Sequence, residues 1–248
     1  MLEKAATLPA DEIVVDLEDG VAAAAKEAAR ERLGEARARG TLAIRINGTA
    51  SPWWREDLAA AAEARPDVVV VPKVSSPDDV LAVAELLPDG VGLEVQIESA
   101  RGLVEVERIA AADDRLEALV FGPGDFGASL GVPVLTIGAG AWEYALARIA
   151  VAAGAFGLQA VDGPHAALRD LDGLRASARR ALAHGFAGKW VLHPDQIEPV
   201  NEVFTPSPEE VERARRILAA EDGAVLLDGE MVDPASKRLA EALLARLP

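Results

Sequence analysis

Short runs of β-branched and apolar residues alternate along this chain with longer segments rich in Ala, Leu, Arg and Glu. Runs of the first kind are typical of buried strands, and the longer segments have the period of helices. This alternation predicts βα units built around a parallel sheet. We expect seven strands, near Ile13–Leu17, Leu42–Ile46, Val68–Val74, Gly92–Ile97, Ala118–Phe121, Leu158–Val161 and Trp190–Leu192.

The expected strands recur at regular intervals, except for a longer interval between Ala118 and Leu158. Regular recurrence favours a (β/α)₈ TIM barrel within the α/β class, and the long interval predicts an active-site loop. A doubly wound fold is the weaker alternative, because no glycine-rich dinucleotide fingerprint follows any strand. Seven strands do not close an eight-stranded barrel. Since residues 1–11 look helical, we expect the first strand to lie upstream of Met1 or to be replaced by another segment.

The chain divides into one large unit and a short appendage. We expect residues 1–220 to form the TIM-barrel catalytic domain, which ends with the helix-like stretch Pro208–Ala220. A polar, glycine-containing break follows, and residues 221–248 then form a C-terminal segment outside the barrel.

Composition excludes several classes of protein. The chain has 248 residues, half of them hydrophobic, which suits one large soluble domain. Its formal charge of −16 argues against nucleic-acid partners and anionic membrane surfaces. The absence of cysteine rules out disulfides and thiolate chemistry, and the N-terminus does not have the pattern of a signal peptide. These features predict a cytoplasmic protein.

Two acidic residues, Glu98 and Asp125, each lie just past a predicted strand. Because the carboxyl ends of parallel strands meet at one face, two such carboxylates can hold one hard cation. Either acid could instead cap a helix. Further charged residues at strand ends favour a site over caps, and these are Glu18, Asp19, Arg45 and Lys73.

The sequence leaves more than one interpretation open for the other candidate residues. Lys73 could donate to a substrate, pair with a rim acid, or form a Schiff base in a barrel aldolase. Residues 122–124 (Gly122, Pro123 and Gly124) could present backbone amides to a bound carboxylate or could form a tight turn. His193 is interpreted mainly as a hydrogen-bonded structural residue. For Lys26 and Arg30 a solvated helix face is favoured over contacts with phosphates.

Eight sequence motifs carry a family resemblance. In chain order they are VVDLEDGVAAAAKEAAR, AIRING, VVPKV, QIESARG, FGPGDFGASLG, VDGP, GFAGKWVLHPDQIEPVN and DGEMVDP. Together they resemble the citrate lyase β-subunit-like and malyl-CoA lyase branch of the HpcH/HpaI aldolase superfamily. The resemblance covers nearly the whole chain and implies a (β/α)₈ barrel. The family opens with an arginine-serine strand and a proline-glycine turn, which this chain lacks.

The resemblance assigns roles to these candidates. It makes Glu98 and Asp125 the protein ligands of Mg²⁺, with Mn²⁺ as a substitute, and Arg45 the active-site arginine. Glu18 and Asp19 then support Arg45, whose alternative role is a structural ion pair with one of them. It also places Asp233, in MVDP, on a C-terminal lid that often covers a neighbouring subunit's site. Partial desolvation there is expected to raise the pKa of Asp233, so that it exchanges a proton with the substrate carbon.

The resemblance implies a metal-dependent lyase that cleaves a β-hydroxyacyl-CoA thioester by a retro-Claisen route. The expected partners are an acyl-CoA and a small 2-oxo acid (glyoxylate, pyruvate or oxaloacetate), in a homo-oligomer that is a trimer or a hexamer. Malyl-CoA, β-methylmalyl-CoA and citramalyl-CoA are the leading substrates. Three alternatives stay open, namely a citrate lyase β subunit acting on a citryl carrier protein, a metal-dependent 2-oxo-acid aldolase, and a non-catalytic assembly subunit.

Overall fold

The computed structural model describes residues 2–133, 135–221 and 223–247. Seven parallel strands, β1 to β7, form one sheet in which the spatial order follows the chain order. The α/β fold and its parallel sheet are therefore as predicted. The strands are β1 (Glu12–Asp16), β2 (Thr41–Arg45), β3 (Val68–Val71), β4 (Gly92–Ile97), β5 (Leu116–Phe121), β6 (Gln159–Asp162) and β7 (Gly188–Lys189).

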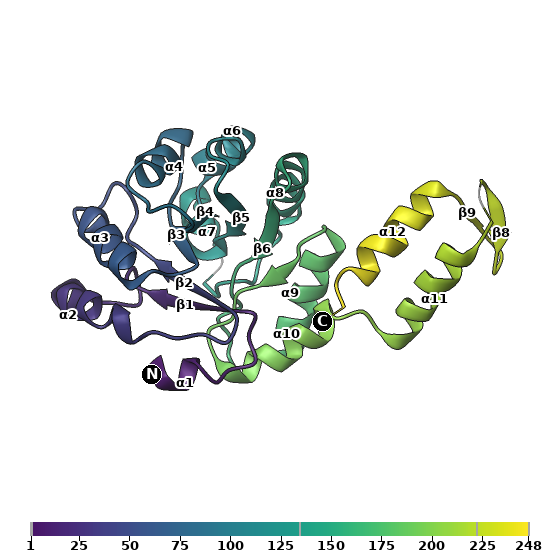
Figure 1. Cartoon of the computed structure of the whole chain (residues 1–248), viewed down its shortest axis with the longest axis horizontal. Coiled ribbons are helices and arrows are strands. Elements are labelled where there is room, and N and C mark those ends of the chain that lie inside the picture. The colour runs from purple at the N-terminus through teal and green to yellow at the C-terminus, as the bar shows by residue number, and fades with distance from the viewer. Residues whose placement is uncertain (1, 134, 222, 248) are drawn as a thin grey trace.

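Helices between the strands cover the outer face of the curled sheet (Figure 1). The apolar core lies between these two layers, where Ile44, Val69 and Leu119 are fully buried. The elements are α1 (Leu2–Ala5), η1 (Ala23–Ala25), α2 (Lys26–Glu31), η2 (Leu33–Glu35), α3 (Trp54–Ala64), α4 (Pro77–Ala84), α5 (Ala100–Val104), α6 (Val106–Ala110), α7 (Pro123–Leu130), α8 (Glu143–Phe156), α9 (Leu171–Ala183), η3 (Pro194–Gln196) and α10 (Ile197–Phe204).

The sheet is open among the described residues, because β1 pairs only with β2 and β7 pairs only with β6. The burial of the strand residues differs between the edges and the centre of the sheet. Every residue of β3 and β4 is buried, whereas every residue of β1 and β7 is only half-buried. The seven strands thus form a half-barrel whose two edge strands lack a partner on one side.

The last strand lies earlier than predicted. Trp190–Leu192 was the expected segment, but β7 comprises Gly188 and Lys189. Only these two residues pair with β6, whose last residue is Asp162, and the chain then leaves the sheet toward η3. In the long interval between β5 and β6, residues 131–133 and 135–142 lie outside any helix or strand, between α7 and α8, where the loop was predicted.

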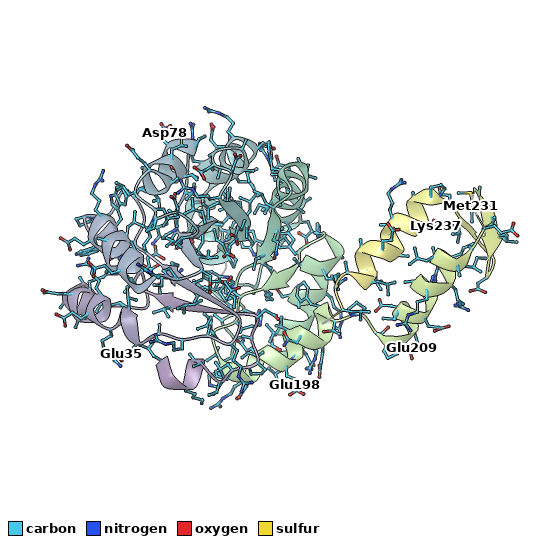
Figure 2. The ribbon with its side chains drawn as sticks, in the orientation of Figure 1. Glu35, Asp78, Glu198, Glu209, Met231 and Lys237 are labelled. Atoms are coloured by element: carbon cyan, nitrogen blue, oxygen red, sulfur yellow. The ribbon has the colours of Figure 1, made fainter. Side chains whose placement is uncertain are left out.

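An arm projects from the half-barrel (Figure 1). It contains the helices α11 (Pro208–Ala219) and α12 (Pro234–Leu244), which pack against each other, and the hairpin β8 (Val225–Leu227) and β9 (Glu230–Val232). Figure 2 places Glu209, Met231 and Lys237 on this arm. The domain boundary expected at residue 220 falls at the end of α11, inside the arm. Within the described residues, no helix has the length and apolar character needed to cross a bilayer.

Candidate functional site

The carboxyl ends of the strands bring the predicted charged residues together at one rim. Arg45 ends β2, while Glu18, Lys73 and Glu98 lie just beyond β1, β3 and β4. Glu18 is the centre of the group, because its carboxylate lies 3.1 Å from Arg45 Nη1 and 2.7 Å from Lys73 Nζ. Asp125 lies in the first turn of α7, close enough for its charge to act on Glu98.

Arg45 is held in a fixed orientation. Its Nε and Nη2 donate to the two carboxylate oxygens of Asp16 at 2.8 and 2.7 Å, and its Nη1 donates to Gln96 at 3.2 Å. The guanidinium also lies 5.7 Å from the ring centroid of Trp190. Burial works to raise the pKa of Asp16, but the hydrogen bonds and charge of Arg45 outweigh it and lower that pKa. The planar donor group of Arg45 is therefore oriented before any substrate binds.

The pKa of the Lys73 side chain is shifted in the direction opposite to the one that a Schiff-base nucleophile needs. Burial works to lower its pKa, but ion pairs with Glu18 and with Asp19, at 2.7 and 3.2 Å, raise that pKa above its ordinary value. An imine-forming lysine must instead be neutral near pH 7. The backbone of Lys73 has a positive φ of 56°, and its N–H donates to Glu98 Oε1 at 2.6 Å. Lys73 thus serves the site through its backbone amide and its charge.

Glu98 is a buried carboxyl group with a strongly shifted pKa. Only 5% of the residue is exposed. Burial, followed by the negative charges of Glu18 and Asp125, raises the pKa of Glu98 to about 8, although the N–H of Lys73 opposes the shift. Burial is the larger cause, because it removes the water that would stabilise the charged form of the carboxyl group.

The glycine-containing turn after β5 makes room for Glu98. A Cβ atom on Gly122 would lie 2.4 Å from the Cβ of Glu98 and 2.5 Å from its Oε2. The N–H of Gly122 donates to the carbonyl of Ile97 at 3.1 Å, which favours the tight-turn interpretation for this residue. Pro123 has no N–H. The first-turn amides of α7 that can approach an anion are those of Gly124 and Asp125.

The donor set suits a hard divalent cation. Among the described residues, no group of three or more His, Cys, Asp or Glu side chains is arranged to hold a metal ion. Two carboxylates, Glu98 and Asp125, suit Mg²⁺, which usually keeps several waters and leaves positions for a substrate.

Comparison with known sequences identifies the family. A sequence model of the HpcH/HpaI aldolase/citrate lyase family matches residues 1–194. The chain belongs to this family. An L-malyl-CoA/β-methylmalyl-CoA lyase from Cereibacter sphaeroides is 38% identical over 284 residues, covering 98% of this chain and 89% of the relative. A (3S)-malyl-CoA thioesterase from the same species is 40% identical over 244 residues, covering 94% and 85%. The family predicted from the motifs is confirmed.

Solved structures agree with this placement in the HpcH/HpaI family. CitE from Mycobacterium tuberculosis, in complex with magnesium, acetoacetate and coenzyme A, has a TM-score of 0.83 and 36% identity. That match covers 96% of this chain and 90% of the other. A citrate lyase from Burkholderia xenovorans has a TM-score of 0.85 at 23% identity, which supports the fold alone.

Asp233, the lid acid expected from the family, is the N-cap residue of α12, and α12 lies on the arm (Figure 1). It caps α12, where its Oδ1 accepts hydrogen bonds from the backbone N–H and the hydroxyl of Ser236 at 2.9 and 3.1 Å. These bonds lower the pKa of Asp233. The expectation of a raised pKa is therefore wrong in this conformation, because hydrogen bonds to the charged form favour ionisation.

Two residues of the site were missed or misjudged from the sequence. Asp16, the bidentate partner of Arg45, was not predicted. Lys26 was expected on a solvated helix face, but it is buried and its Nζ donates to the carbonyls of Leu17 and Glu18 at 2.6 and 2.8 Å. The small residues on both sides of Lys26, in AAAAKEAA, were the available signal of a close approach.

Proposed function

We propose that this chain is a Mg²⁺-dependent carbon–carbon lyase that cleaves or forms a β-hydroxyacyl-CoA thioester of the malyl-CoA class. The observation that carries the proposal is the rim arrangement, in which the carboxylates of Glu98 and Asp125 interact and Glu98 lies close enough to the oriented Arg45 for their charges to act on each other. The relatives named malyl-CoA lyase, and the magnesium and coenzyme A complex of CitE, support the same class. L-malyl-CoA, β-methylmalyl-CoA and citramalyl-CoA are the candidate substrates, with glyoxylate, pyruvate or oxaloacetate as the 2-oxo acid.

The site residues divide the work of a retro-Claisen cleavage. When bound, Mg²⁺ supplies a Lewis acid that polarises the carbonyl formed at the carbon being released. Glu98 and Asp125 hold the cation, and the N–H groups of Gly124 and Asp125 bind the substrate carboxylate. Arg45 stabilises negative charge on the thioester oxygen. The hydroxyl proton passes to solvent, the carbon–carbon bond breaks to give the 2-oxo acid, and the enolate of the shorter acyl-CoA takes up one proton on carbon, so that no net proton is gained or lost.

We further propose that the arm covers the site of a neighbouring copy, in a homotrimer or hexamer. Three exposed apolar side chains on the arm, Leu226, Met231 and Leu239, support such a contact. Asp233, whose bonds to Ser236 favour its ionised form, would remove the α-proton in the condensation direction, and its protonated form would return that proton to the enolate in cleavage. One more strand between β1 and β7 would complete the TIM barrel. A chain without cysteine suits the cytoplasm.

A malyl-CoA thioesterase is the second candidate function. The observation that favours it is the 40% identity to (3S)-malyl-CoA thioesterases. Arg45, together with a cation held by the same carboxylates, would then stabilise the negative charge on the thioester oxygen during attack by water. The two activities differ in the bond that breaks, which is carbon–carbon in the lyase and carbon–sulfur in the thioesterase.

Products identified by mass spectrometry decide between these candidates. With L-malyl-CoA and Mg²⁺, the lyase gives acetyl-CoA and glyoxylate, whereas the thioesterase gives free CoA and malate. EDTA should abolish turnover and Mg²⁺ or Mn²⁺ should restore it. Glu98→Gln should lower kcat by about 100-fold or more, at the upper end for disturbed metal sites. Exposed Glu56 provides the matched control, and Glu56→Gln should leave turnover unchanged.

Three outcomes would contradict the proposal. Turnover that survives chelation would remove the metal from the mechanism. Cleavage restricted to a citryl group on a carrier protein would instead indicate a citrate lyase β subunit. Condensation of free pyruvate with an aldehyde, without CoA, would indicate a simple aldolase.

A further inference from the structure

Lys189 is a buried cation that the proposed mechanism does not use. It ends β7, and its side chain is 1% exposed. Its Nζ donates to Asp162 Oδ2 at 2.5 Å, to the carbonyl of Gly163 at 2.5 Å and to the hydroxyl of Ser177 at 3.1 Å. A buried ion pair of this kind adds little stability relative to apolar residues of similar volume, because both charges lose their hydration. The role of Lys189 therefore depends on the residues that it holds in place.

The held residue is Gly163, in the turn after β6. Its N–H donates to Asp162 Oδ1 at 2.9 Å and its carbonyl accepts from Lys189, so the Lys189–Asp162 pair fixes both of its peptide groups. Gly163 packs directly on the neighbouring turn. A Cβ atom at this position would lie 2.2 Å from the carbonyl oxygen of Phe121 and 2.2 Å from Cδ of Pro123.

The turn against which Gly163 packs carries the proposed metal site. Pro123 is the first residue of α7, and Asp125 follows it within the same helical turn. Gly122, which precedes Pro123, is in close contact with Glu98. A shift of Gly163 would therefore displace Pro123 and change the separation between Asp125 and Glu98. The contacts form a continuous path from Lys189 to both carboxylates.

We propose that Lys189 is a positioning residue for the metal site. Acting through Gly163, it fixes the turn that carries Asp125 and so sets the distance between Asp125 and Glu98. The inference rests on the proposed function in one respect, which is that these two carboxylates are the ligands of the cation. The side chain of Lys189 lies on the side of the sheet that α9 covers, where its Nζ donates to the hydroxyl of Ser177.

The test uses Mn²⁺ binding to the intact protein, followed by electron paramagnetic resonance, together with kcat, KM and the melting temperature. Lys189→Met should raise the Kd for Mn²⁺ about tenfold or more and lower kcat by a similar factor, the usual effect of losing a group that orients metal ligands. KM for the thioester should stay within about twofold, because Lys189 touches no substrate. Arg115, just before β5, pairs with Asp113 and donates to the carbonyl of Ala84. As the control, Arg115→Met should lower the melting temperature without changing Mn²⁺ affinity.

A double variant separates positioning from charge balance. Asp162→Asn combined with Lys189→Met removes both buried charges and keeps an oxygen that can accept from the N–H of Gly163, so the melting temperature should recover and the variant should fold. Mn²⁺ binding should stay weak, because the bond to the Gly163 carbonyl is still absent.

Recovery of both Mn²⁺ affinity and melting temperature in the double variant would overturn the inference. Wild-type Mn²⁺ affinity and kcat in the single variant Lys189→Met would also overturn it. Wild-type protein that binds Mn²⁺ but cleaves no thioester would overturn the proposed function alone. Wild-type protein that binds no Mn²⁺ would overturn both.

Discussion

Gly122 is the residue at which site geometry can be tested most directly. In Gly122→Ala the new methyl group would lie 2.4 Å from the Cβ of Glu98, so the carboxylate must move. We expect Mn²⁺ binding to weaken and kcat to fall by about 100-fold, the usual penalty for a displacement near 1 Å. Metal titration and steady-state kinetics would measure both effects.

Gly154 provides the matched control for this substitution. It lies on the exposed side of α8, and a Cβ atom there would meet nothing within 4 Å. Gly154→Ala should raise the free energy of unfolding by about 0.5–1 kcal/mol and leave activity unchanged. Wild-type Mn²⁺ affinity in Gly122→Ala would mean that Glu98 does not hold the cation.

For individual residues, the sequence predicted which ones lie at the site better than it predicted which of them contact each other. Strand ends in a parallel sheet converge, which is why Arg45, Lys73 and Glu98 could be placed together in advance. The partner of Arg45 could not be deduced, because Asp16 lies opposite it only through the β1–β2 register. Register depends on the whole sheet, and a shift of one residue would have turned Asp16 to the other face.

Two facing carboxyl groups on β1 and β4 make the stability of the sheet depend on pH. Burial, followed by the negative charge of Glu12, raises the pKa of Glu94 to about 9, and burial also raises the pKa of Glu12. In the unfolded chain both groups release their protons near pH 4.5. Between about pH 5 and 9 the folded protein thus binds more protons than the unfolded chain, so the free energy of unfolding must fall as pH rises.

Urea unfolding in EDTA would measure this dependence. We expect the free energy of unfolding to be lower at pH 9.5 than at pH 6 by more than about 1 kcal/mol, since one unit of pKa shift is worth 1.36 kcal/mol. Glu94→Gln should remove most of the difference by eliminating the titrating group. The shifted pKa of Glu98 acts in the same direction, so some slope should remain. Equal stability at both pH values would contradict the prediction.

Helices and strands were predicted well where the local sequence pattern and the tertiary contacts favour the same structure. The strand at Gly92–Ile97 was placed with its observed limits, and the helix expected at Pro208–Ala220 ends one residue earlier. The edge strand β7 was misplaced, because the ladder with β6 ends at Lys189 and only the N–H of Trp190 still donates to the carbonyl of Asp162. The β8–β9 hairpin was missed, although Asp228 and Gly229, both with positive φ, form its typical two-residue turn.

For the whole molecule, the sequence indicated a separate C-terminal segment but not its direction. The arm extends away from the half-barrel (Figure 1). Asp233 lies on this arm at the start of α12, and the sequence did not predict which residues it contacts. Sequence pattern reports which faces are apolar, not which copy of the chain covers them. The exposure of Leu226 and Met231, at 79% and 69%, is the structural feature that favours a second copy.

Mixing two inactive variants tests whether the arm serves a neighbouring site. Glu98→Gln lacks a metal ligand and Asp233→Asn lacks the arm acid, so each alone should lose about 100-fold or more in kcat. If each site takes Glu98 from one copy and Asp233 from another, subunit exchange at equal amounts should restore about a quarter of the sites. Asp228→Asn, on the same arm and exposed beside Arg216, should keep full activity as the control. No recovery after subunit exchange demonstrated by mass spectrometry would place Asp233 in the site of its own chain, and full activity of Asp233→Asn would remove it from the reaction.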